Sequence, residues 1–138
     1  MKKIIIDTNA LISFVTDREP EQQAKIAKVF NDASQLKVRL LCPQNVLTEF
    51  IYVMDKVYHI ENTEINEMVK DFIVLPGIEI VHEVNMKLLL SFWPEHFADY
   101  GDAIVAAVCK DTKGSSIASF DQKLRIKLKK LRLSVFSI

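Results

Sequence analysis

The segment Lys3-Ile4-Ile5-Ile6-Asp7 places a short β-branched run directly before a carboxylate. A short, continuous apolar run of this kind predicts a strand that is buried on both faces. Similar runs predict strands at 38–41, 78–81, 116–120 and 133–136, and helical spacing predicts helices at 20–30, 44–58, 63–74, 85–92, 102–110 and 122–132. Because strands alternate with helices, we expect a single α/β domain over residues 1–138, an α/β/α sandwich with a central, mainly parallel sheet.

The overall composition is that of a folded chain. Hydrophobic residues make up 49% of the 138 positions, which excludes global disorder. No apolar run approaches the roughly 20 residues of a membrane-spanning helix, and the N-terminal apolar stretch ends at Asp7, too early for a signal peptide. Cys42 and Cys109 have apolar neighbours, which is typical of reduced core cysteines. We therefore expect a cytoplasmic protein with no membrane partner.

The formal net charge of zero hides an asymmetry along the chain. Residues 1–109 carry 16 acidic and 10 basic side chains, whereas residues 110–138 carry 2 acidic and 8 basic ones. The acidic excess of the first segment and the basic excess of the second cancel only in the sum over the whole chain. A neutral composition is therefore no argument against a nucleic-acid partner, because such a partner contacts local basic surface.

Four carboxylates occur where the apolar pattern does not favour a charge. Asp7 and Asp121 directly follow predicted strands, and chemistry in open α/β sheets gathers at such carboxyl ends. Glu49 lies along the apolar stripe of the helix predicted at 44–58, and Asp102 opens the apolar run 103–109. A buried carboxylate must be paired, protonated or metal-bound, because burying an isolated charge is costly.

Each of these carboxylates also has a purely structural explanation. Asp7 can shape a turn, Glu49 can pair with a Lys or Arg, Asp102 can interact with the helix dipole, and Asp121 and the nearby Asp99 can cap helices. As a set, however, they offer the oxygen ligands that suit Mg²⁺ or Mn²⁺. A bound cation would offset the repulsion among them, and two such ions can activate a water towards a phosphodiester.

Four short motifs, in order along the chain, resemble those of a known family. They are Ile4-Ile5-Ile6-Asp7-Thr8-Asn9-Ala10-Leu11, Pro43-Gln44-Asn45-Val46-Leu47-Thr48-Glu49-Phe50, Asp102-Ala103-Ile104-Val105-Ala106-Ala107 and Ser119-Phe120-Asp121. Together they resemble the successive motifs of PIN-domain ribonucleases. The chain length and the motif order are similar to those of the small VapC-type toxins of toxin–antitoxin systems.

The resemblance implies an endoribonuclease that depends on Mg²⁺ or Mn²⁺ and hydrolyses RNA phosphodiesters with a metal-activated water. The acidic metal-binding positions of the family correspond here to Asp7, Glu49, Asp102 and Asp121. Thr8 and Asn9 match residues that support the first aspartate, and Ser119 matches the Ser or Thr two positions before the last acid. Asp99 matches a position that is less regularly acidic in the family, and the resemblance implies that it is an extra ligand or a group that supports one.

The resemblance also implies partners, and alternatives remain beside it. Such toxins usually form homodimers and are inhibited by an antitoxin protein whose tail enters the active-site groove. Lys123, Lys127 and Lys130 lie on one side of the helix predicted at 122–132, where they contact RNA phosphates or form an ordinary solvated face. The alternatives are an RNA- or protein-binding module without catalysis and an RNA-processing nuclease that is not a toxin. A phosphatase of the haloacid-dehalogenase type is disfavoured, because Asn9 stands where its second aspartate belongs.

Overall fold

Four parallel strands form the central sheet of this computed structural model, which describes residues 1–138. They are β1 (Lys2–Ile6), β2 (Val38–Pro43), β3 (Ile78–Val81) and β4 (Ser115–Ala118). The order across the sheet is β3-β2-β1-β4, and Ile4 of β1 lies opposite Leu40 on one side and Ser116 on the other. Because β1 is flanked by strands and covered on both faces, its three isoleucines are fully buried. The predicted α/β fold with a parallel sheet is confirmed.

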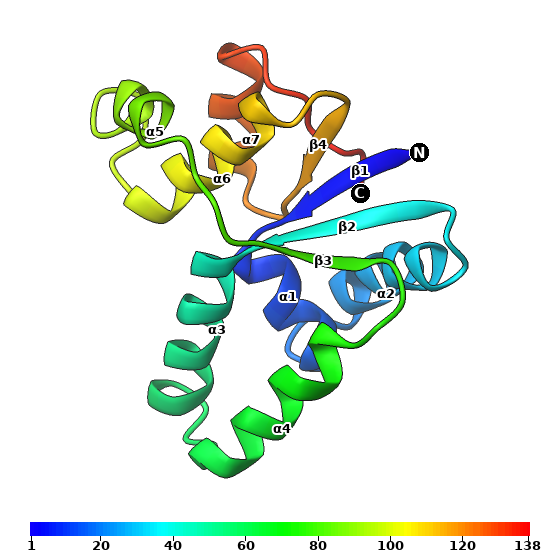
Figure 1. Cartoon of the computed structure of the whole chain (residues 1–138). Helices are drawn as coiled ribbons and strands as arrows, with labels where there is room; N and C mark the ends of the chain where they lie inside the picture. Colours follow the sequence, from blue (N-terminus) through cyan, green and yellow to red (C-terminus); the bar gives the residue numbers. More distant parts are fainter.

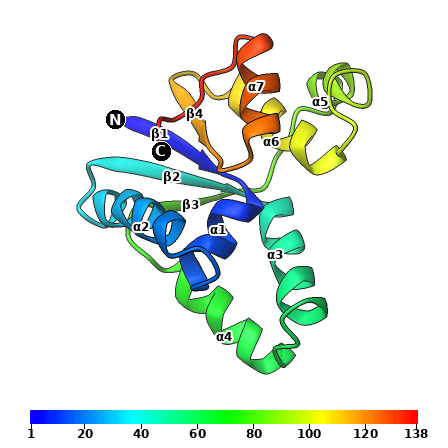
Figure 2. The ribbon, with the colours of Figure 1, turned by 180° about the vertical axis from the view of Figure 1, so that it is seen from behind.

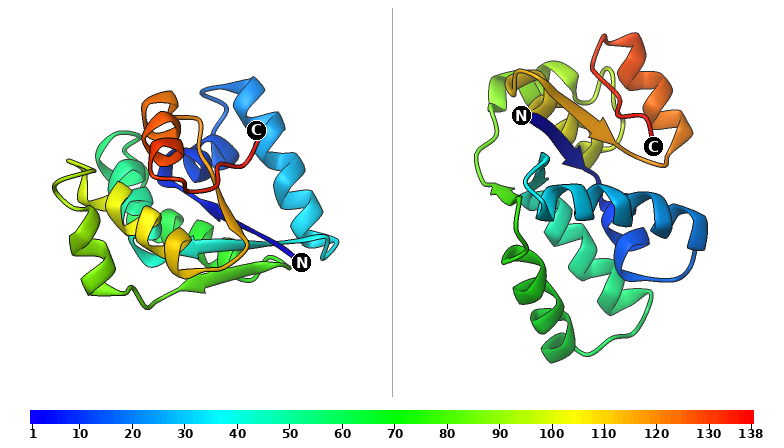
Figure 3. Two further views of the ribbon diagram at one scale, coloured as in Figure 1. Left: turned by 90° about the horizontal axis from the view of Figure 1, so that it is seen from above. Right: turned by 90° about the vertical axis from the view of Figure 1, so that its right-hand side faces the viewer.

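Seven helices cover the two faces of the sheet. They are α1 (Thr8–Val15), α2 (Pro20–Ser34), α3 (Gln44–Lys56), α4 (Asn62–Ile73), α5 (Met86–Phe92), α6 (Tyr100–Asp111) and α7 (Gln122–Lys130). Helices α1 to α4 lie on one side of the sheet and α5 to α7 on the other, seen from the front in Figure 1 and from behind in Figure 2. The same two layers stand apart when the molecule is viewed from its side (Figure 3).

One continuous core of 32 buried residues joins the sheet to both helix layers. Helices α2 and α3 pack against β2, α4 packs against β3, and α6 packs against β4 and β2. Cys42 and Cys109 are both buried and both free thiols, as the sequence predicts. None of the helices is both long enough and apolar enough to cross a membrane.

The prediction of a strand at 133–136 is wrong. This segment returns along β4 but forms only one isolated bridge, between Ile117 and Val135. Two hydrogen bonds hold it, from Ile117 N to Ser134 O at 2.9 Å and from Phe136 N to Ile117 O at 2.9 Å. The chain enters the segment through Arg132, whose φ of 61° lies in the left-handed region.

Candidate active site

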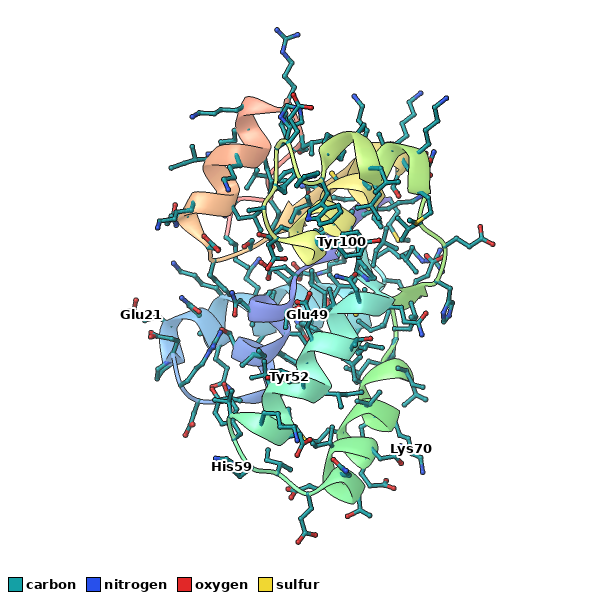
Figure 4. The ribbon with its side chains drawn as sticks, turned by 90° about the vertical axis from the view of Figure 1, so that its left-hand side faces the viewer. Glu21, Glu49, Tyr52, His59, Lys70 and Tyr100 are labelled. Carbon is teal, nitrogen blue, oxygen red and sulfur yellow. The ribbon has the colours of Figure 1, made fainter.

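The carboxyl ends of the strands open into an acidic pocket of about 530 Å³. Its lining includes all five acids expected from the sequence, which are Asp7, Glu49, Asp99, Asp102 and Asp121. Thr8 and Asn9 also line it. Figure 4 views this edge of the molecule and shows Glu49 on α3 close to the start of α6, where Tyr100 lies. Residues from β1, α3, α6 and the loop after β4 thus meet at one place, although they are far apart in the sequence.

Asp7 sits at the junction of β1 and α1 and is only 6% exposed. It is the N-cap of α1, and its Oδ1 accepts a hydrogen bond from Ala10 N at 2.8 Å. Burial raises the pKa of the Asp7 carboxyl to about 6, hydrogen bonds from Ser119 and Ala10 oppose this rise, and repulsion from Asp121 and Glu49 adds to it. A charge at this position is therefore costly unless a cation is present.

Ser119 connects the first and the last acid of the pocket. It is fully buried directly after β4. Its hydroxyl hydrogen-bonds the Asp7 carboxyl, and its Oγ accepts the backbone N–H of Asp121 at 3.1 Å. One side chain therefore fixes the position of both acidic residues relative to each other.

Glu49 is held by two features of its surroundings. The Thr8 hydroxyl donates to Glu49 Oε2 at 2.6 Å, so the hydrogen bond of Thr8 runs to Glu49 and not to Asp7. The other oxygen, Oε1, lies against Gly101, where a Cβ atom would collide with it. Asn45 Nδ2 donates to Gly101 O at 3.5 Å across the same contact. Close packing of α3 on the start of α6 thus places this carboxylate.

Asp99 and Asp102 both belong to the start of α6. Asp99 is the N-cap, and its Oδ1 accepts from Asp102 N at 2.9 Å. The pKa of the Asp102 carboxyl is raised to about 7, first by burial and then by repulsion from the other four acids of the pocket, Asp99, Asp7, Asp121 and Glu49. Asp102 therefore lies within electrostatic reach of the other four carboxylates.

Asp121 and the lysines of the basic helix α7 that follows it are more exposed than Asp7. Asp121 is exposed and caps α7, with Oδ1 accepting from Leu124 N at 3.1 Å. Lys123, Lys127 and Lys130 are exposed on α7, and none of them lines the acidic pocket. The structure thus brings the acids together and leaves these lysines on the neighbouring surface.

No basic side chain neutralises the pocket. The four salt bridges of the protein involve Asp32, Asp55, Glu67 and Glu79, none of which lines it. The pairing of Glu49 with a Lys or Arg, considered from the sequence, is therefore not observed. One further oxygen, Oδ1 of Asn45, is buried without any hydrogen-bond partner.

The donor set fits a hard divalent cation in kind, because it consists of carboxylate and amide oxygens. No three His, Cys, Asp or Glu side chains stand close enough together to hold a metal ion as they are placed. Binding an ion would therefore require these carboxylates to come closer together than they stand here. Sequence reasoning did not single out Asn45, Tyr52 or Gly101, which line the same pocket and carry no charge to mark them.

Comparison with known families agrees with this geometry. The family model of the PIN domain matches residues 4–129. This range is nearly the whole chain and includes every acid of the pocket. The chain belongs to the PIN domain family. PIN domains are typically nucleases that act on nucleic acid and usually use divalent metals. No curated protein matches the chain.

Proposed function

We propose that this PIN domain is an endoribonuclease that depends on Mg²⁺ or Mn²⁺ and cleaves RNA by hydrolysis. The observation that carries the proposal is the group of five carboxylates that meets at the ends of the strands without any basic partner. Burial, together with repulsion from the other four acids, raises the pKa of Asp102 to about 7. A fold tolerates such a group when a cation compensates it in the working state.

The residues that would hold the ions are Asp7, Glu49, Asp102 and Asp121, with Asp99 as an extra ligand or a group that supports one. When bound, the ions supply the positive charge that activates a water and offsets the charge of the phosphodiester. Thr8 keeps Glu49 oriented through its hydroxyl, and Ser119 keeps Asp7 in place. The water oxygen bonds to phosphorus while the bond from phosphorus to the leaving ribose oxygen breaks, and the proton that the water loses ends on that ribose oxygen. No side-chain nucleophile is needed.

Cleavage of labelled single-stranded and structured RNAs by the purified protein tests this proposal. We expect cleavage with Mg²⁺ or Mn²⁺ and none with EDTA. Asp102→Asn and Asp7→Asn should each lower the rate by about 100-fold or more, because losing even an outer contact of a metal site typically costs 10- to 100-fold. The matched control is Asp111→Asn, an exposed acid at the other end of α6. Cleavage that survives EDTA, or that falls equally in the control, would contradict the proposal.

The biological role proposed for this nuclease is that of a toxin. We infer a cytoplasmic, homodimeric toxin of the VapC type, inhibited by an antitoxin protein, from the chain length and the order of the four motifs. Induced expression in a bacterial host should stop growth, Asp102→Asn should not, and co-expression of the neighbouring short reading frame should restore growth. Normal growth with an active purified enzyme would instead favour an RNA-processing nuclease. RNA binding without cleavage would favour a binding module.

The basic face of α7 is proposed to hold RNA phosphates beside the pocket. Lys123, Lys127 and Lys130 are exposed and make no salt bridge. Replacing all three with Gln should weaken RNA binding and reduce its dependence on salt, because each phosphate contact releases counterions. Unchanged salt dependence would mean that these lysines form only a solvated face.

A further inference from the structure

A second hollow adjoins the acidic pocket. It has a volume of about 340 Å³ and is lined by Asn9, Arg18, Glu19, Gln22, Phe120 and Asp121. Asn9 and Asp121 line both hollows. The surface is therefore continuous from the carboxylates, across the starts of α1 and α7, to the loop between α1 and α2. A strand of RNA with one phosphate at the carboxylates would have to continue over a neighbouring surface of this kind.

Arg18 is oriented in this second hollow by neutral acceptors. Its Nη2 donates to Asn9 O at 3.3 Å and to Ser13 Oγ at 3.2 Å. Ser13 is fully buried and in turn donates to Gln22 Oε1 at 2.9 Å. Arg18 forms no salt bridge, even though Glu19 is its neighbour in the chain. Because a guanidinium has five N–H donors and both bonds use Nη2, most of its donors stay available for a phosphate.

The rest of the hollow offers what a nucleobase requires. Phe120 is half-buried, packs on the core and is the only hydrophobic residue that lines the hollow, and aromatic side chains are the usual stacking partners of bases. Gln22 accepts from Ser13 through Oε1, which leaves its Nε2 as a donor, and the side chain of Asn9 makes no hydrogen bond. An acidic side chain would match Arg18 alone, whereas every nucleotide combines an anionic phosphate with a planar base that can stack on Phe120. The hollow therefore favours a nucleotide.

We propose that this second hollow binds the nucleotide next to the scissile phosphate, with its phosphate on Arg18 and its base on Phe120. The proposal rests on the proposed function, since it assumes that RNA enters the acidic pocket. It adds a recognition site for a flanking nucleotide, formed by residues of the α1–α2 corner and of the loop after β4.

Binding of a labelled single-stranded RNA of mixed sequence to the Asp102→Asn protein, with Mg²⁺ present, tests this second hollow. Arg18→Ala and Arg18→Gln should raise Kd by about 10-fold, as expected for the loss of a charge-assisted contact. Both should reduce the slope of log K against log salt by about 0.7, because one phosphate contact is lost. Phe120→Leu, which keeps an apolar side chain on the core, should raise Kd by about 5-fold without changing the slope.

The matched control is Lys113→Ala, which removes one exposed positive charge just before β4, at the opposite end of this strand from Phe120. Its Kd and salt slope should stay at the Asp102→Asn values. Equal effects of Arg18→Gln and Lys113→Ala would overturn the proposal, as would competition by polyglutamate that is as strong as competition by unlabelled RNA. Thermal unfolding of each variant identifies any loss of folding, and Arg18→Gln keeps a polar side chain at this position.

The two proposals fail in different ways. If the wild-type protein cleaves RNA and Arg18→Gln binds RNA as well as its parent, the second hollow is wrong and the nuclease stands. If RNA binding depends on Arg18 but the wild-type protein cleaves no RNA with either metal, the nuclease proposal is wrong and the second hollow stands.

Discussion

Replacing Asp7 by Asn should stabilise the metal-free protein at neutral and higher pH. The Asp7 carboxyl is buried, and its pKa is raised from the ordinary 3.8 to about 6. A rise of this size corresponds to about 3 kcal/mol, since each pKa unit is worth ~1.4 kcal/mol. Asn keeps the helix cap, because its amide oxygen can accept from Ala10 N as the carboxylate does. It carries no charge, so the cost of burying one is removed.

The pH dependence follows from the direction of the shift. Between pH 3.8 and about 6 the folded state holds a proton on Asp7 that the unfolded state has lost, so the free energy of unfolding falls as the pH rises. The advantage of Asp7→Asn should be absent below this window, grow through it, and reach about 3 kcal/mol above it. For a chain of this size we expect an increase in Tm of roughly 10 °C at pH 8.

Urea and thermal unfolding in EDTA, followed by circular dichroism from pH 4 to pH 8, measure this difference. The exposed Asp111→Asn serves as the control and should match the wild type throughout. Adding Mg²⁺ or Mn²⁺ should stabilise the wild type more than Asp7→Asn, because only the wild type gains compensation of the buried charge. If Asp7→Asn is no more stable than the wild type in EDTA at pH 8, the cost argued for burying a charge at this site is absent.

Three further substitutions test how the carboxylates are held. Gly101→Ala should lower activity by about 10-fold with little change in Tm, because the added methyl displaces Glu49 Oε1; unchanged cleavage kinetics would contradict this contact. Ser119→Ala should lower the free energy of unfolding by about 2 kcal/mol in urea, since it removes the hydroxyl that bonds Asp7 and leaves a backbone N–H unpaired. Thr8→Val should raise the Mn²⁺ concentration needed for half-maximal activity by about 10-fold, whereas Thr8→Ser should restore it.

Much of the fold follows from local pattern. The isoleucine run of β1 is apolar on every position because the strand is central and covered on both faces. The alternation of strands and helices then requires a parallel sheet, because the connections cross over its faces. Asp7 and Asp121 follow β1 and β4, which are neighbours in the sheet, so their proximity follows from topology alone.

The remaining features depend on contacts that no local pattern specifies. Whether residues 133–136 pair with β4 depends on where α7 ends and how the chain turns at Arg132. The close approach of α3 and α6 at Gly101, which places Glu49, is a contact between residues far apart in the sequence. Helix α1 shows no clear apolar period in the sequence, because its eight residues cover only about two turns.

Helix capping and metal binding, which look like rival explanations of the same aspartates in the sequence, are compatible in the structure. Asp7, Asp99 and Asp121 are the N-caps of α1, α6 and α7, and each uses Oδ1 to accept the backbone N–H three residues later. The second oxygen of each carboxylate takes no part in this bond. Three helix N-termini, each with a partial positive charge, therefore point towards the acidic pocket and lower the cost of gathering negative charge there. The capping bonds fix the carboxylates on rigid elements, and the oxygens they leave over are the ones that a cation would use.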